Sequence, residues 1–312
     1  MHVLLTGGGG MLASSIAEAW ASRRPDDALT VLSRRDVDLK DAAATRSAIS
    51  AAAPDTVIHT AAFVGGIGDK TARPLPYLLD NLRIDASVLD AVVAEEVPGY
   101  LYTASAAAYP ASAPNPIVED ALFAGRLEPA NEGYGLAKLA GLTAVGYAAR
   151  QTGRAYRAIL PSNLYGPRDT FDPTRSHLIA STIFKAHSAR EAGSDQVEVW
   201  GDGTARREFT YAPDLAAWIA DAIDDLADWP VHMNVGAGVD HSIRDFYEIA
   251  AATVGFDGEL AFDPTKPSGV PQRLIDSTLA RQHGWAPRTD IREGMAACYA
   301  SFLARTATGD LR

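Results

Sequence analysis

A tyrosine and a lysine stand four residues apart in the stretch Tyr134-Gly-Leu-Ala-Lys138. At that spacing two side chains share one face of a helix and lie close enough to interact. An ammonium beside a phenol favours the phenolate, so we expect Lys138 to lower the pKa of Tyr134 from about 10. With the hydroxyl of Ser105, which precedes them, the three residues predict a proton donor for a carbonyl that is being reduced. The alternative for the pair alone is an ordinary solvated helix face.

A glycine-rich loop near the N-terminus predicts a dinucleotide site. It reads Thr6-Gly-Gly-Gly-Gly-Met-Leu-Ala13, follows an apolar run and opens a helical pattern. Gly7 and Gly10 begin a GxxGxxA spacing that permits a tight turn. Backbone N–H groups at the start of the helix, which begins with Met11 and Leu12, can then approach a pyrophosphate. The alternative is a glycine-rich turn that binds nothing.

The end of the second apolar run distinguishes the two nicotinamide cofactors. An acidic residue there accepts from the ribose of NAD, whereas an arginine suits the 2′-phosphate of NADP. The chain has Ser33-Arg34-Arg35-Asp36, so we expect NADP, although Asp36 leaves NAD open and an exposed loop is the structural alternative. Further cofactor contacts are expected from Asp38 and Leu39 at the adenine edge and from the small pair Ala61 and Ala62.

Composition limits the class of protein. The chain has 312 residues, 47% hydrophobic and 21% charged, which suits one large α/β domain or two lobes. A net charge of -11 argues against a general nucleic-acid binder. Cys298 is the single cysteine, so no intrachain disulfide forms and a reducing compartment fits. Without a signal peptide or an apolar run of about 18 residues, we expect a cytoplasmic protein that does not enter the membrane, and nothing suggests a metal site.

The elements that must position these residues alternate in type. Strand-like runs at 3–5, 29–32, 56–60, 100–103 and 155–160 alternate with helical patterns at 11–24, 41–52, 76–94 and 131–151. Such alternation predicts βαβ units and a doubly wound parallel sheet, the Rossmann arrangement. After Pro161 the rhythm loosens. The segments 212–226 and 231–235 are expected to return to the sheet, and helical patterns follow at 243–254, 278–282 and 290–303.

Nearly the whole chain resembles the GDP-L-fucose synthase-like family of extended short-chain dehydrogenase/reductases. The segments that carry the resemblance are Ala62-Phe-Val-Gly-Gly-Ile67, Leu127-Glu-Pro-Ala-Asn-Glu132, Tyr134-Gly-Leu-Ala-Lys-Leu-Ala-Gly141, Pro161-Ser-Asn-Leu-Tyr-Gly-Pro167, Ser176-His177, Val199-Trp-Gly-Asp-Gly-Thr204, Arg207-Glu-Phe209, Asn234-Val-Gly236 and Lys266-Pro-Ser-Gly269. The resemblance implies NADPH-dependent handling of a GDP-4-keto-6-deoxy sugar, with epimerisation at C3 and C5 before reduction at C4. It also implies a homodimer formed through the helices at 76–94 and 131–151.

The family pattern assigns roles to individual residues. Tyr134 would protonate the C4 oxyanion, Lys138 would also bind the nicotinamide ribose, and Ser105 would hydrogen-bond the same oxygen. Further contacts with the cofactor or sugar are implied for Pro161, Asn163, Leu164 and His177, and contacts with the nucleotide for Lys185, Trp200, Arg207 and Lys266. We expect an NADP-binding domain of residues 1–165 and about 208–240, and a smaller, largely C-terminal substrate domain of about 166–207 and 241–312. A core tryptophan and surface cations are the structural alternatives for the nucleotide contacts.

One position departs from the family pattern in a way that bears on the chemistry. Inversion beside a carbonyl needs two acid/base groups, and the family uses a cysteine two residues after the serine together with a later histidine. Here the cysteine position is Ala107, which cannot exchange a proton, while the histidine remains as His177. We therefore predict a C4 ketoreductase for a GDP-4-keto-6-deoxy-hexose, or a related GDP-keto-heptose, that has lost or weakened epimerisation. His177 then serves as a substrate hydrogen-bonder or as a structural histidine, and Cys298 is expected to be a buried thiol.

Other activities remain as alternatives. The nearest is the full epimerase-reductase, in which another group or water replaces the thiol. A 4,6-dehydratase is disfavoured because three alanines follow Ser105, and a UDP-sugar 4-epimerase because Arg34 and Arg35 indicate exchangeable NADP. A non-catalytic NADP sensor is a different class, disfavoured by the intact Ser105, Tyr134 and Lys138.

Overall fold

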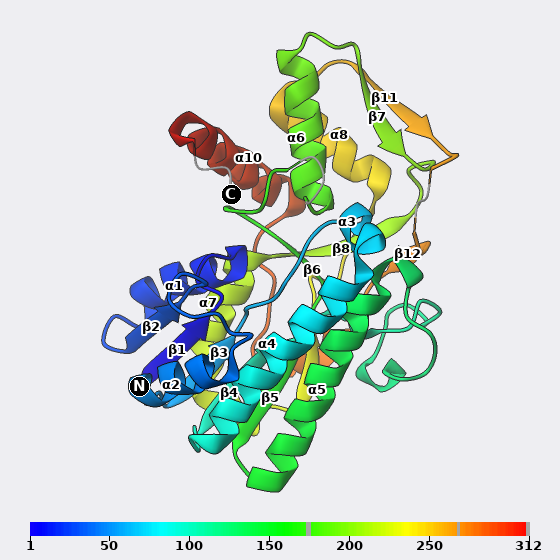
Figure 1. Ribbon diagram of the computed structural model, residues 1–312. Helices are drawn as coiled ribbons and strands as arrows, with labels where there is room; N and C mark the ends of the chain where they lie inside the picture. The colour runs from blue at the N-terminus through cyan, green and yellow to red at the C-terminus, as the bar shows by residue number, and fades with distance from the viewer. Residues whose placement is uncertain (173–175, 267–268, 310–312) are drawn as a thin grey trace.

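Six parallel strands form the central sheet of the computed structural model, which describes residues 1–172, 176–266 and 269–309 (Figure 1). The strand order is β2–β1–β3–β4–β5–β9, with bounds Ala28–Leu32, His2–Thr6, Thr56–His59, Gly99–Thr103, Ala155–Pro161 and His232–Val235. Each pairing is parallel. β3 and β4 are buried along their whole length, as expected for central strands covered on both faces. The doubly wound α/β prediction is confirmed.

Helices cover both faces of this sheet. α1 (Met11–Arg23) and α7 (Ala212–Ala222) pack together on one face, around Trp20 and Leu215. α2 (Ala42–Ala52), α4 (Pro74–Ala94) and α5 (Glu132–Thr152) cover the other face, where α4 and α5 lie side by side (Figure 1). The segment 212–226, which was expected to return to the sheet, is helical, because α7 continues into the 3₁₀ turn η4 (Ile223–Asp228). The segment 231–235 supplies the edge strand β9, as expected.

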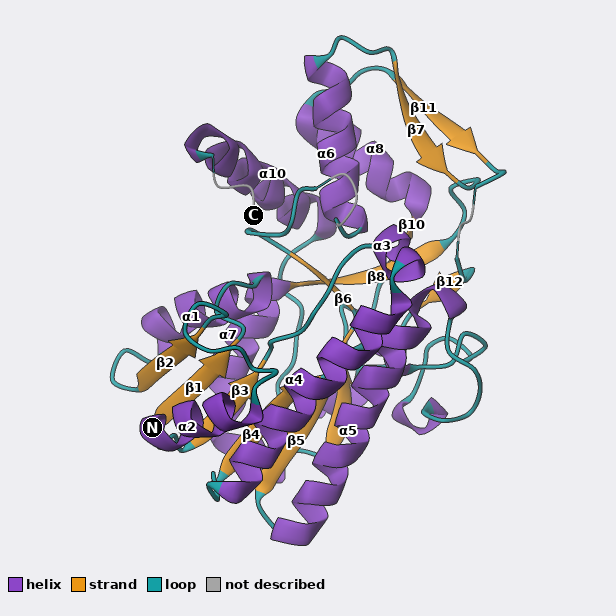
Figure 2. Ribbon diagram, in the orientation of Figure 1, coloured by secondary structure: helices purple, strands orange, loops and turns teal. Residues whose placement is uncertain are grey.

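A second group of elements packs beyond the carboxyl end of the sheet, at the top of Figure 2. It contains α6 (Leu178–Glu191), α8 (Ile243–Val254), α10 (Ile291–Thr308) and the parallel strands β7 (Gln196–Trp200) and β11 (Glu259–Asp263). Their shared core includes Phe246, Met295 and Phe302. Cys298 lies in that core, where burial raises the pKa of its thiol, so the prediction of a buried cysteine is confirmed.

A small sheet links the two groups, and the sequence patterns did not predict it. Its central strand β8 (Arg206–Tyr211) pairs in parallel with β6 (Asn163–Tyr165) and β12 (Gln272–Arg273), and antiparallel with β10 (Asp240–Ser242). Short helical turns complete the fold: α3 (Ile67–Ala72), α9 (Thr278–Gln282), η1 (Ala106–Ala108), η2 (Glu119–Ala121) and η3 (Pro129–Asn131). No helix in the described ranges is long and apolar enough to cross a bilayer.

Candidate active site

Ser105 and Tyr134 meet where η1 packs against the first turn of α5. Ser105 follows β4 and begins η1, and its Oγ accepts a hydrogen bond of 3.2 Å from the backbone N–H of Ala107. Tyr134 is buried, and its hydroxyl is close enough to the Ser105 side chain for Ser105 to lower the pKa of the phenol. The neighbouring Gly135 permits this approach, because a Cβ at that position would lie 2.5 Å from the carbonyl oxygen of Ala107.

A buried arginine holds the η1 segment in place. The Nη1 atom of Arg273, on β12, lies 3.3–3.5 Å from the carbonyl oxygens of Ala106, Tyr109 and Pro110, to which it donates. Arg273 was not among the predicted site residues, since it lies 168 positions after Ser105 and belongs to no local motif. Its guanidinium connects the small sheet to the loop that carries the serine.

The protonation state of Tyr134 differs from the sequence expectation. Burial raises the pKa of its phenol, the charge of Asp85 raises it further, and the Ser105 side chain only partly offsets these effects. The expectation that Lys138 lowers this pKa is therefore wrong for this arrangement. Because the Lys138 ammonium is paired with Asp85, it does not act on Tyr134 as an unopposed charge. The Tyr134 phenol is therefore protonated at neutral pH.

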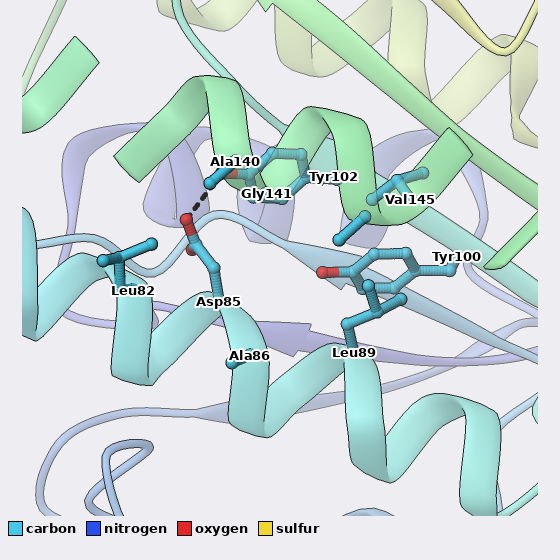
Figure 3. Close-up of a pocket in the computed structure, with 10 residues that line it drawn as sticks. Leu82, Asp85, Ala86, Leu89, Tyr100, Tyr102, Ala140, Gly141 and Val145 are labelled. Atoms are coloured by element: carbon cyan, nitrogen blue, oxygen red, sulfur yellow. Dashed lines mark hydrogen bonds between the residues drawn. The ribbon is translucent and has the colours of Figure 1, made fainter. Parts of the chain in front are cut away.

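Lys138 is completely buried in a polar network that the sequence did not reveal. Its Nζ lies 3.4 Å from both carboxylate oxygens of Asp85 on α4 and 4.7 Å from the ring centre of Tyr102. Asp85 also accepts from the Tyr102 hydroxyl at 2.6 Å, as Figure 3 shows, and contacts His59 Nε2 at 3.1 Å. His59 Nδ1 is bonded in turn to the Thr6 hydroxyl at 2.7 Å. Burial opposes ionisation of Asp85, but Lys138, His59 and Tyr102 together lower its pKa, so the carboxyl is charged.

The glycine loop has the shape of a dinucleotide cradle. Gly7 adopts φ +86°, and a Cβ there would lie 2.8 Å from the Thr60 hydroxyl and from the Ala61 N–H. Gly10 is the N-cap residue directly before α1, and no side chain caps the helix. The N–H groups of Met11 and Leu12 therefore lie in the first turn. A pyrophosphate fits a helix N-terminus of this kind. The residues present therefore fit the expected cofactor.

The loop after β2 exposes two arginines. Asp36 accepts from the N–H and hydroxyl of Ser33 at 2.8 and 2.6 Å, and these bonds lower its pKa. Its carboxylate therefore closes the loop, while Arg34 and Arg35 are exposed and neither has a salt bridge to a described residue. Asp38 is exposed and Leu39 buried, and Ala61 and Ala62 are half-buried beyond β3. Two exposed arginines beside a carboxylate that is already hydrogen-bonded suit the 2′-phosphate of NADP.

A second cluster of cations and an aromatic ring lies in the upper group of elements. Trp200 is 49% exposed, and the Nζ atoms of Lys185 and Lys266 lie 6.0 and 5.9 Å from its ring centre. Arg207 on β8 lies near Arg273, and burial lowers the pKa of each guanidinium, with Glu128 opposing that effect. An exposed indole beside several cations suits a base and a diphosphate.

The remaining predicted residues lie between these clusters. Asn163 begins β6, is exposed, and donates from Nδ2 to the Glu208 carbonyl at 3.3 Å, while Pro161 is buried and Leu164 half-buried. His177 immediately precedes α6. Burial, and then the charge of Lys70, lower the pKa of His177 to about 4, so its ring is neutral. Lys70 is a further charged residue close to His177, and the sequence motifs did not identify it.

Comparison with known proteins places the chain in a family. The model of the NAD dependent epimerase/dehydratase family matches residues 3–236. The chain belongs to this family. It is 35% identical over 304 residues to a GDP-L-colitose synthase of Yersinia pseudotuberculosis, covering 97% of this chain and 98% of that protein. It is also 35% identical to a GDP-L-fucose synthase of Escherichia coli, with 97% and 96% covered. The resemblance drawn from the motifs is thereby confirmed.

A solved structure extends the similarity to the fold. A GDP-mannoheptose C4 reductase from Campylobacter jejuni with NADP bound superposes with a TM-score of 0.86 at 26% identity, covering 97% of this chain and 98% of that one. A GDP-L-fucose synthetase from Naegleria fowleri bound to NADP, at 22% identity, has the same fold with a TM-score of 0.87.

Proposed function

We propose that this protein is an NADPH-dependent C4 ketoreductase of a GDP-4-keto-6-deoxy-hexose or a related GDP-4-keto-heptose, with little or no 3,5-epimerase activity. The observation that carries the proposal is the placement of Ser105 and buried Tyr134 close together, next to Ala107. The pair supplies a proton donor for a ketone oxygen. Ala107, which cannot exchange a proton, stands where the family pattern has the cysteine used in epimerisation.

The chain's own groups can be assigned to steps of the reduction. NADPH, when bound, supplies hydride to the carbonyl carbon. Tyr134 gives its phenolic proton to the C4 oxygen, and Ser105 donates a hydrogen bond to the resulting phenolate or to the same oxygen. Lys138 binds the nicotinamide ribose, and its ammonium is held in place by the Asp85 carboxylate. Gly7, Gly10, Met11 and Leu12 hold the pyrophosphate, and Arg34 and Arg35 the 2′-phosphate.

The substrate nucleotide is assigned to the cluster around Trp200. The indole stacks on the base, and Lys185, Lys266 and Arg207 neutralise the diphosphate. The relatives named above act on GDP-linked sugars, which supports guanine as the base. The proposed division of the chain follows from this, with the cofactor on residues 1–165 and 208–240 and the sugar nucleotide on 166–207 and 241–312.

Deuterium incorporation tests the proposal. GDP-4-keto-6-deoxy-mannose, NADPH and the enzyme are combined in D₂O, and the product is examined by NMR. We expect a reduced sugar without deuterium at C3 or C5, and gain of deuterium in an Ala107→Cys variant, where His177 can complete the pair of acid/base groups. Deuterium at both carbons of an L-sugar from the unaltered enzyme would overturn the loss of epimerisation. No turnover with NADPH still bound would exclude the hexose and make the heptose the next substrate tested.

Full epimerase-reductase activity is the second candidate, and one observation favours it. His177 is neutral and Lys70 is close to it, so the cluster holds two groups that can exchange protons even without a thiol. The deuterium experiment separates the two candidates directly.

We also propose that the protein is a homodimer and that a second copy covers an apolar groove between α4 and α5. Leu82, Leu89, Ala140 and Val145 line the groove, with Asp85 and the two tyrosines 100 and 102 at its floor (Figure 3). Pairing the same two helices of each copy buries this surface symmetrically. Leu89→Arg is expected to give monomers in light scattering, whereas Leu303→Arg on the exposed face of α10 leaves the mass unchanged. Dimers in the Leu89 variant would exclude this interface.

A reducing, cytoplasmic location is part of the proposal, because the chain carries a single cysteine and that cysteine is buried.

A further inference from the structure

Lys70 brings a positive charge onto the face of the catalytic phenol. It lies on α3, and its Nζ is 4.6 Å from the ring centre of Tyr134. The ammonium donates to Asn131 Oδ1 at 3.2 Å, and no described carboxylate forms a salt bridge with it. Asp69, next to it on α3, is instead bonded to Arg73. The Lys70 side chain is therefore directed toward Tyr134 and Asn131 of the candidate site.

The groups around Lys70 come from four elements. Tyr134 lies on α5, His177 at the start of α6, and Glu128 just before η3, where it accepts from the Asn131 amide at 2.6 Å. On α4, the Tyr77 hydroxyl donates to the Asp69 carboxylate at 2.6 Å, so neither group presents an uncompensated charge to Lys70. Burial lowers the pKa of Lys70 to about 8, and Glu128 partly opposes that shift.

We propose that Lys70 is a positioning residue of the reduction, whose ammonium stabilises the phenolate left when Tyr134 gives up its proton. The proposal rests on the proposed ketoreductase function and names a residue that no motif assigned. The O–H bond of Tyr134 breaks and an O–H bond forms on the sugar. Tyr134 later recovers a proton from water, and Lys70 remains an ammonium throughout.

The position of the Lys70 ammonium over the Tyr134 ring makes their interaction stronger in the transition state than before proton transfer. A cation over a neutral ring is attracted by the ring quadrupole, and that attraction grows when the ring carries a full negative charge. The stabilisation is therefore greater after proton transfer than before it. Lys138, on the same helix as Tyr134, is committed to Asp85 at 3.4 Å, which leaves Lys70 as the cation near the phenol without a salt-bridge partner in the described part of the chain.

The pH dependence of reduction is the first test. In the unaltered enzyme we expect kcat to fall as the pH rises through about 8, because Lys70 then loses its charge. Lys70→Gln is expected to lower kcat by about tenfold at pH 7 and to remove that fall, with the NADPH affinity unchanged. Lys70→Arg, which keeps the charge, should restore kcat and hold it to higher pH. Lys40→Gln, at an exposed lysine that pairs with Asp80, is the matched control and should keep the original profile.

A second readout does not depend on the substrate. In NMR titrations of the histidine rings, we expect His177 to protonate at higher pH in Lys70→Gln than in the unaltered enzyme, since a nearby positive charge has been removed. An unchanged pH profile in Lys70→Gln would overturn the proposal. Deuterium exchange at C3 or C5 in the unaltered enzyme that disappears in Lys70→Gln, with reduction intact, would also overturn it and make Lys70 a base for epimerisation. If no keto sugar is reduced at all, the proposed function fails, and an unchanged His177 titration then refutes the role of Lys70 independently.

Discussion

Replacing Asp85 by Asn removes the carboxylate that pairs with buried Lys138 in the described part of the chain. At 3.4 Å and an effective dielectric constant of about 20, the attraction between the two charges is about 5 kcal/mol. Asparagine keeps the shape and one acceptor oxygen but leaves the ammonium without an opposing charge in a fully buried position. Breaking one partner of a buried pair costs about 3–5 kcal/mol, so we expect the free energy of unfolding to fall by that amount.

The assay is urea unfolding followed by circular dichroism, with the unfolding free energy compared between variants. Asp90→Asn is the matched control, because Asp90 is exposed on the same helix, and its effect should stay within about 0.5 kcal/mol. If Asp85→Asn is no less stable than Asp90→Asn, the buried charge pair does not stabilise the fold and the reasoning is refuted. The same variant should lower the pKa of Tyr134, since the charge of Asp85 raises it.

The pair also sets a dependence of stability on pH. The pKa of Asp85 is lower in the folded state than the unfolded value of about 3.9. Its contribution to stability is therefore complete above that unfolded value and disappears as the pH falls through the folded pKa. In acid the stability difference between the unaltered protein and Asp85→Asn should shrink, and a difference that stayed constant down to pH 2 would contradict this assignment.

Three further outcomes follow from the site. Tyr134→Phe should lower kcat by at least about 100-fold while NADPH binding, followed by fluorescence, is retained; near-normal reduction would remove Tyr134 from the proton transfer. Arg34→Ser combined with Arg35→Ser should cut the preference for NADPH over NADH in kcat/KM by at least about tenfold, and an unchanged ratio would place the 2′-phosphate elsewhere. Trp200→Ala should weaken GDP binding in calorimetry by about tenfold without loss of stability, whereas Phe123→Ala, at another exposed aromatic residue distant in sequence, should not; equal effects would refute the stacking role.

Local sequence patterns were sufficient for the sheet and the cofactor loop. Parallel strands buried on both faces are mostly apolar, so β3 and β4 were recognisable from their runs of aliphatic and aromatic residues. A glycine at φ +86° in a tight turn is also a local requirement, and Gly7 revealed it. The small sheet around β8 was not recognisable, because its strands are short and its partners come from distant parts of the chain.

The identities of Ser105, Tyr134 and Lys138 were fixed by spacing and order, since a helix places residues four apart on one face whatever surrounds it. Their electrostatics were decided by tertiary structure. A pKa depends on the charges and the burial around a group, and these come from segments far apart in the chain. Asp85, brought in by α4, neutralises Lys138 and raises the pKa of Tyr134, while Lys70 from α3 lies over the Tyr134 ring. The sequence by itself thus determined which reacting groups are present, and only the folded chain decided which charges surround them.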